Sequence, residues 1–160
     1  MISIARTLLK PALLIGAQIL FQPFASQNGI TMGQRKAAEE TPLFREYRGV
    51  ELGMAADDAR RKLGGPKDKG DEQDFFVIND KETAQIVYDK AHKVVTISVD
   101  YVTGAADVPT PKKVFGSDIP VKPDGSMYRM VRYTKAGLWV SYNRTPGDSP
   151  LISITIQKIE

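Results

Sequence analysis

Oxygen donors that could bind a cation gather in one short charged segment. They are Asp68, Asp71, Glu72 and Asp74, and carboxylates of this kind are the ligands that Ca²⁺ prefers. Lys67 and Lys69 interrupt the group, and its spacing does not fit the loop of an EF-hand. A solvated charged loop is the better interpretation, so we expect no metal site here.

Catalytic residue types are sparse along the chain. There is no cysteine, and His92 is the single histidine, which leaves Ser and Lys as the candidate nucleophiles and excludes a thiolate site. His92 lies in a turn-like segment and is expected at the surface. Adjacent Asp57 and Asp58 point apart on a helix, so we interpret them as first-turn charges rather than paired acids. The sequence predicts no catalytic residues, no cofactor and a non-enzymatic protein.

Aromatic residues and arginines alternate near the C-terminus and form the strongest candidate site. Its members are Tyr128, Arg132, Trp139 and Tyr142, with Arg129, Tyr133 and Arg144 nearby. These residue types dominate the energetics of protein–protein interfaces. In a small fold some of them must instead lie in the core, Trp139 or Tyr142 above all. If Leu138 and Val140 face inward, alternation places Trp139 outside.

Residues 1–26 resemble a secretory signal peptide. Arg6 and Lys10 precede an apolar run over residues 11–21, which is too short and interrupted for a membrane-spanning helix. Its cleavage site is poor, so an uncleaved N-terminal anchor is the alternative. Residues 27–45 are small and polar, which is typical of a flexible leader. We therefore expect a periplasmic or secreted protein.

The charge balance gives little support for binding nucleic acid or anionic membrane. The chain has 22 basic and 19 acidic residues, and loss of Arg6 and Lys10 would leave 20 basic residues and a net charge of +1. No basic stripe remains, so no nucleic-acid partner is expected. Without a cysteine there is no lipid-anchor motif, and membrane contact is peripheral at most.

Residues 50–66 predict a short amphipathic helix that ends at a Gly-Gly-Pro sequence. Asp57 and Asp58 suit the first turn, and basic residues 60–62 suit the last turn. Ala55, Ala59 and Leu63 share a narrow apolar face. A helix of this length is not stable alone and must pack on a sheet.

Six strand-like runs follow this helix, in two sets of three. The first set covers residues 75–78, 84–88 and 93–102, and the second covers 126–133, 138–142 and 151–159. Clear period-two alternation in the last run of each set predicts a sheet with one covered face. The fold class is α+β, with short helices, including a turn at 112–115, packed on an antiparallel sheet. The two sets suggest a degenerate tandem repeat, with sub-repeats 46–103 and 104–160. Any antiparallel meander has the same strand order, however. The pattern is also compatible either with one sheet or with two small domains.

Residues 49–66 resemble the opening of the SmpA/OmlA family, which includes the small lipoprotein of the outer-membrane β-barrel assembly machinery. Gly53, Met54, Leu63, Gly64 and Pro66 match its Gly-Met entry and Leu-Gly-x-Pro exit. The resemblance implies a helix followed by a three-stranded meander, in a domain over residues 46–160. A doubled unit of this kind is similar to the β-lactamase-inhibitor-protein fold. The chain departs from the family pattern at Ala55, where Thr is usual, and no membrane-contacting residue of the family can be placed.

These observations lead to one expected function and two alternatives. We expect a protein-binding or scaffold module of the bacterial cell envelope, and the resemblance implies a link to outer-membrane assembly or maintenance through an unidentified envelope partner. One alternative is an inhibitor of a secreted hydrolase such as a β-lactamase. The other is a small lipid- or glycan-binding module, which a deep apolar pocket would favour.

Overall fold

The computed structural model describes residues 41–159. The predicted signal peptide and residues 27–40 of the predicted leader lie outside the described residues. In chain order the elements are β1 (Glu46–Tyr47), β2 (Val50–Glu51), α2 (Ala56–Leu63), β3 (Asp68–Lys69), β4 (Gln73–Asn79), β5 (Glu82–Tyr88), β6 (Val94–Tyr101), α3 (Pro111–Phe115), β7 (Met127–Tyr133), the 3-10 turn η1 (Thr134–Ala136), β8 (Leu138–Arg144) and β9 (Ile152–Lys158).

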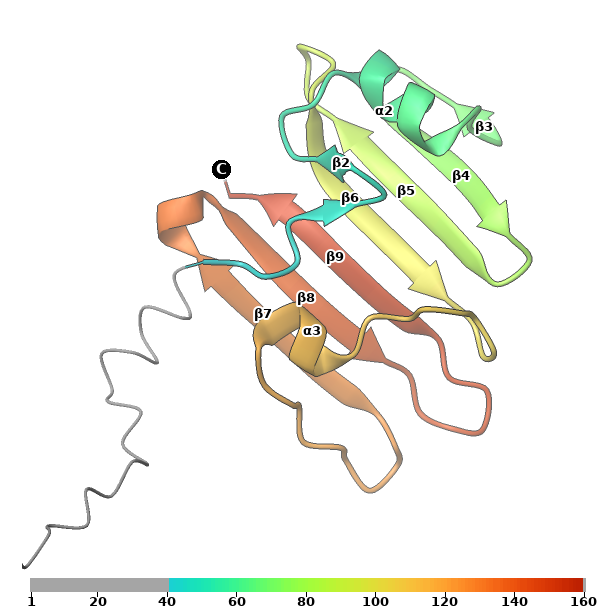
Figure 1. Cartoon of the computed structure of the whole chain (residues 1–160), viewed down its shortest axis with the longest axis vertical. Helices are drawn as coiled ribbons and strands as arrows, with labels where there is room; N and C mark the ends of the chain where they lie inside the picture. The colour runs from blue at the N-terminus through green and yellow to red at the C-terminus, as the bar shows by residue number, and fades with distance from the viewer. Residues whose placement is uncertain (1–40, 160) are drawn as a thin grey trace, which may run out of the picture.

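The strands form one broad antiparallel sheet, with helices on a single face (Figure 1). Its seven strands run in the order β3-β4-β5-β6-β9-β8-β7, and β1 and β2 form a separate hairpin. Both α2 and α3 lie on the same side as this hairpin (Figure 1). The predicted α+β class, with short helices on an antiparallel sheet, is confirmed.

The two predicted sets of strands occupy the two halves of that sheet. β4, β5 and β6 form one meander, β7, β8 and β9 form the other, and a helix precedes each. The halves meet where β6 pairs with β9, from Thr96 opposite Gln157 to Tyr101 opposite Ile152. The choice between one sheet and two is therefore settled in favour of one sheet.

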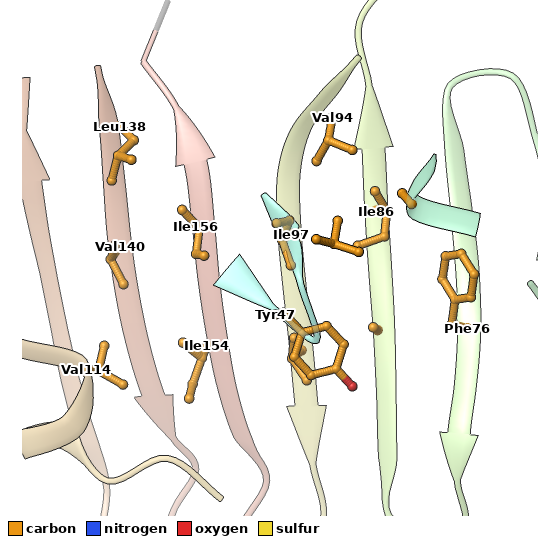
Figure 2. Close-up of a cluster of buried hydrophobic side chains, with 14 of the residues drawn as sticks. Tyr47, Phe76, Ile86, Val94, Ile97, Val114, Leu138, Val140, Ile154 and Ile156 are labelled. Carbon is orange, nitrogen blue, oxygen red and sulfur yellow. The ribbon is translucent and has the colours of Figure 1, made fainter. Parts of the chain in front are cut away.

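The core lies between the sheet and the short elements that cover it (Figure 2). One transverse row contains Ile86, Ile97, Ile156 and Val140, which face one another across four adjacent strands and are fully buried. β-branched side chains suit such a position because they pack well on a pleated surface. Val114 of α3 and Tyr47 of β1 approach the sheet from the covering layer (Figure 2).

Helix α2 is held mainly by the sheet below it. Its N-cap residue is Ala55, whose side chain cannot accept a capping hydrogen bond, and Asp57 and Asp58 occupy the first turn as predicted. Each aspartate accepts from the arginine three residues later, Arg60 or Arg61. The buried face consists of Ala56 and Ala59, small residues that let the helix lie close to the strands.

Two local details differ from the predicted pattern. Strict alternation would bury Val95 with Ile97, but a register shift beside Tyr88 buries Val94 and leaves Val95 partly exposed. The packed structure also begins before residue 46, since Pro42 is buried and Phe44 packs against the core. Pro42 and Phe44 are thus part of the packed structure, whereas Leu43 between them is 60% exposed.

Neighbouring residues of β4 provide a test of the two faces. Phe76 is 1% exposed and Val77 is 52% exposed. We expect Phe76→Ala to lower the free energy of unfolding by about 3–5 kcal/mol, through lost burial and a cavity. The free energy of unfolding of Val77→Ala should differ from that of the parent by no more than about 0.5 kcal/mol. Denaturant unfolding checks both, and similar losses for the two variants would contradict the assignment of the covered face.

Candidate protein-interaction surface

The second face of the seven-stranded sheet is left uncovered by the described residues. Side chains on this face come from the alternate positions of each strand, and none of them is buried. Its centre is polar, with a hydrogen bond of 2.9 Å between Ser98 and Thr155 and another between Ser153 and Asp100. Apolar side chains gather instead towards the two edges.

One edge carries the aromatic and basic group that the sequence singled out. Tyr128 is 58% exposed and Met130 is 46% exposed, while Arg132 is exposed and Trp139 is half-buried. Arg132 stands opposite Trp139 in the register of β7 and β8. We call Tyr128, Met130, Arg132 and Trp139 the β7–β8 patch. The prediction that Trp139 faces away from Leu138 and Val140 is confirmed.

Tyr142 does not belong to this patch. It is only 2% exposed and shares the covered face with Val140, so its placement in an exposed patch is wrong. The alternation of β8 separates it from Trp139, three positions away, because an odd spacing along a strand reverses the side-chain direction. Burial raises the pKa of its phenol, although nearby Arg144 acts in the opposite direction.

The other residues near the patch face the core or pair within the chain. Arg129 lies over the ring of Phe115 at 5.0 Å and donates to Ser117 Oγ. Tyr133 is buried, and Arg144 donates to the carbonyl of Gly125. The sequence analysis did not include Met130 in the candidate site. Its spacing of two residues from both Tyr128 and Arg132 places all three side chains on one face of the strand.

Helix α2 is tied to the sheet by a buried carboxylate. Asp74 is fully buried within an otherwise apolar row, and Arg60 donates to it from Nε at 2.7 Å and from Nη2 at 3.2 Å. The hydroxyl of Tyr88 donates at 2.7 Å and the Gly70 amide at 3.1 Å. These bonds satisfy both carboxylate oxygens, as a buried charge requires.

The pKa of Asp74 is lowered in spite of its burial. Desolvation raises the pKa, but the hydrogen bonds from Arg60, Tyr88 and Gly70 favour the ionised form and outweigh it. Asp74 is therefore a structural ion-pair partner rather than a member of a loop that ligates a cation. Within residues 41–159 no group of three or more His, Asp or Glu side chains is placed to hold a metal ion, and His92 is exposed, as predicted for a turn.

The β1–β2 hairpin is attached to the sheet in a similar way, through a second buried carboxylate. Glu82 of β5 accepts from the hydroxyl of Tyr47 at 2.8 Å, from Arg48 at 2.8 Å and from Asn79 at 3.2 Å. Burial and the bond to Glu82 raise the pKa of Tyr47 well above its usual range. Both polar clusters therefore fasten covering elements to the first half of the sheet.

A cleft of about 760 Å³ opens at one end of the sheet. Its walls come from residues 41–45, the end of β2, the β5–β6 turn, η1, and the adjoining ends of β8 and β9. The apolar part includes Pro42, Leu52, Val94 and Leu138. The charged residues around it are Arg45, Lys93, Lys135, Lys158, Glu51 and Asp89. Asp89 accepts from the amides of Ala91 and Lys93 within its own turn.

Comparison of the chain with protein-family models, with curated proteins and with solved structures finds no match.

The Asp74–Arg60 pair predicts a pH-dependent stability. Loss of one partner of a buried ion pair costs about 3–5 kcal/mol, so Asp74→Asn should lower the free energy of unfolding by that amount at neutral pH. Because the folded pKa of Asp74 lies below its unfolded value, this contribution is present above the unfolded pKa and is lost as the pH falls through the folded one.

Denaturant unfolding between neutral and acidic pH measures this difference. The difference in the free energy of unfolding between the parent and Asp74→Asn should become smaller as the solution is acidified. Asp71→Asn, at an exposed carboxylate in the preceding loop, is the matched control and should change stability little at either pH. A gap that stays constant with pH would show that the ionisation of Asp74 does not support the fold.

Proposed function

We propose that this protein is a non-enzymatic binding module of the bacterial cell envelope, and that it contacts a protein partner through the β7–β8 patch. The observation that carries the proposal is the grouping of Tyr128, Met130, Arg132 and Trp139 on a sheet face that no described element covers. Tyr, Trp and Arg are the residue types on which interface energies concentrate.

The sheet supplies the rigidity that such a surface needs. Every residue of β7 is paired with β8 from Met127 opposite Arg144 to Tyr133 opposite Leu138, without a register shift. The covered side of β8 is anchored by Leu138, Val140 and Tyr142, all buried. A partner therefore meets side chains on a preformed backbone, and little backbone entropy is lost on association.

The envelope location rests on the sequence of residues 1–26. The positively charged start and apolar run support export, and residues 41–159 include no helix with the length and apolarity needed to cross a membrane. Location in the periplasm or outside the cell is part of the proposal. A tagged full chain, fractionated from its host and probed for N-terminal processing, tests it.

We also propose the SmpA/OmlA-like relationship and the degenerate repeat. Support comes from the order of α2 and then β4, β5 and β6, which α3, β7, β8 and β9 repeat, and from the way the last strands of both sets pair at the centre. The relationship would link the protein to outer-membrane assembly or maintenance. A shared fold supports no particular partner, so the partner must be identified by experiment.

In-cell crosslinking of the tagged full chain, followed by mass spectrometry, tests the patch. We expect Arg132→Glu and Trp139→Ala each to reduce recovery of a specific envelope protein about tenfold or more, since residues at the centre of an interface contribute about 2 kcal/mol or more. Val77→Ala changes an exposed residue on the same face at the opposite edge and should leave recovery unchanged. Equal recovery with the parent and both patch variants would overturn the proposal.

The cleft supports a second candidate function, the binding of a small anionic amphiphile. Its volume of about 760 Å³ lies in the range of ligand sites. The partly exposed apolar side chains of Leu52 and Val95 suit an acyl chain, and Lys93 and Lys158 in the lining suit a carboxylate or phosphate. This observation favours the lipid-binding alternative over a glycan, which needs more polar walls.

Titration with dodecanoate, a simple fatty acid, tests the cleft. We expect saturable binding that weakens about tenfold or more when Lys93 and Lys158 are both changed to Gln, because a hydrogen bond to a charged group contributes about 1.5–3 kcal/mol. Replacing Lys112 and Lys113 of α3, which lie outside the cleft, by Gln is the matched control. Binding that is absent, or equally strong in both double variants, would rule out this function.

A further inference from the structure

Strand β7 forms an edge of the sheet that nothing in residues 41–159 pairs with or covers. It is the last strand in the sheet order (Figure 1), and among the described strands it pairs with β8 alone. Alternate residues of such a strand direct their amide and carbonyl groups to the open side. A long edge of this kind is a template for another strand, and soluble proteins usually block it.

The opposite edge of the sheet is blocked in two ways that β7 lacks. Strand β3 pairs with β4 at Asp68–Phe75 and Lys69–Asp74, and a register shift interrupts β4 between Val77 and Asn79. Strand β7 contains no Pro, Gly or Lys and no register shift. The two ends of the sheet therefore differ, and the open one coincides with the β7–β8 patch.

We propose that β7 pairs with β7 of a second copy of this chain, antiparallel and about a two-fold axis that passes beside Met130. In this register Met130 faces Met130 of the second copy, and Tyr128 faces Arg132. All seven residues of the strand then find a partner, which no other symmetric register achieves. The sheet continues across both copies with the uncovered face on one side.

The side chains of β7 are complementary in this register. Arg132 would lie beside the ring of Tyr128 of the second copy. Within its own chain, Arg132 stands opposite Trp139. Both aromatic rings favour a guanidinium neighbour. Like charges do not meet, because Arg129 stands opposite Val131. Shifting the register by two residues in one direction would instead set Arg129 against Arg129, which is unfavourable.

Arg129 does not block the edge, although an inward-pointing charge is one means of protecting a strand. Its guanidinium lies over Phe115 and donates to Ser117 at 2.7 Å, so its charge is engaged within its own chain. The outer side chains that meet across the axis, Tyr128, Met130 and Arg132, are all exposed. A second copy would thus find both the open backbone and an accessible row of side chains.

A second copy explains the features of this edge better than a foreign peptide does. A peptide needs only the open backbone, whereas the strand sequence MYRMVRY places an aromatic residue and an arginine at equal distances on either side of Met130. An isologous interface requires this kind of self-matching. Pairing would also double the β7–β8 patch on one continuous face, but the inference does not depend on the proposed function of that patch.

Cysteine crosslinking in cells tests the pairing directly, because the chain has no cysteine of its own. The full chain carrying Met130→Cys is expressed with a tag, oxidised, and examined on a non-reducing gel. Directly opposite residues of antiparallel strands are about 4.5–5.5 Å apart between Cα atoms, within the range that a disulfide spans. We expect a covalent dimer several-fold above that of Val77→Cys, an exposed control on the same face.

The register is tested with two further single-cysteine variants carrying different tags. Tyr128→Cys and Arg132→Cys should crosslink to each other when expressed together, and neither should crosslink to itself. Identical positions would be separated by four residues along the strand, about 13 Å.

Each outcome of these experiments decides the inference. A dimer of Met130→Cys no stronger than that of Val77→Cys would overturn the pairing. Crosslinking of Tyr128→Cys or Arg132→Cys only to itself would overturn the register. Thermal unfolding of each variant confirms that it is folded. Because the readout is a covalent dimer of this chain alone, it is independent of whether the patch binds an envelope protein.

Discussion

Strands β6 and β9 are more than fifty residues apart in the sequence where Asp100 meets Ser153, yet they hydrogen-bond along their length and join the two halves of the molecule. Each half alone is a three-stranded meander with a short helix. A meander of that size buries little apolar surface, and a helix as short as α2 is not stable without a surface to pack on. The pairing of β6 with β9 extends one apolar row across four adjacent strands in both halves of the sheet, from Ile86 to Val140.

The covering layer that residues 41–159 form lies on one side of that sheet, and this asymmetry creates the candidate surface. Buried polar clusters hold the layer in place. Asp74 binds α2 through Arg60, and Glu82 binds the β1–β2 hairpin through Tyr47 and Arg48. Such clusters contribute modest net stability, but they fix orientation because an unsatisfied buried charge is costly. None of the elements in residues 41–159 covers the other side of the sheet.

The position of β7 gives the surface a second property. Its residues Tyr128, Met130 and Arg132 belong to the exposed patch, and its backbone is an open edge among the described strands, so one strand can supply both side-chain and main-chain contacts. The β4 edge, covered by β3 and interrupted by a register shift, offers fewer such contacts. Recognition by this protein is therefore concentrated, in our proposal, at one end of the sheet.

The sequence by itself determined the local elements. Strand-like runs separated by turn residues located the six long strands, with clear period-two alternation in β6 and β9, and the arrangement of charges and glycines located α2. Side-chain direction along a strand or helix depends only on spacing. It also placed Trp139 on the opposite face to Leu138 and Val140. The resemblance of residues 49–66 to a known opening agreed with a helix followed by a meander, but it fixed neither the partner nor the site.

Only the tertiary structure decided which side of each strand is covered and which strand lies at an edge. The residue type of Tyr142 suggested a patch residue, but the structure buries it in the core with its neighbours on β8. The sequence around Asp74 suggested a solvated loop, but the structure buries this carboxylate and pairs it with Arg60 of α2. The order that puts β9 beside β6 and leaves β7 open follows from contacts between distant segments. Spacing along the chain cannot encode such contacts, because they depend on how complete elements pack together.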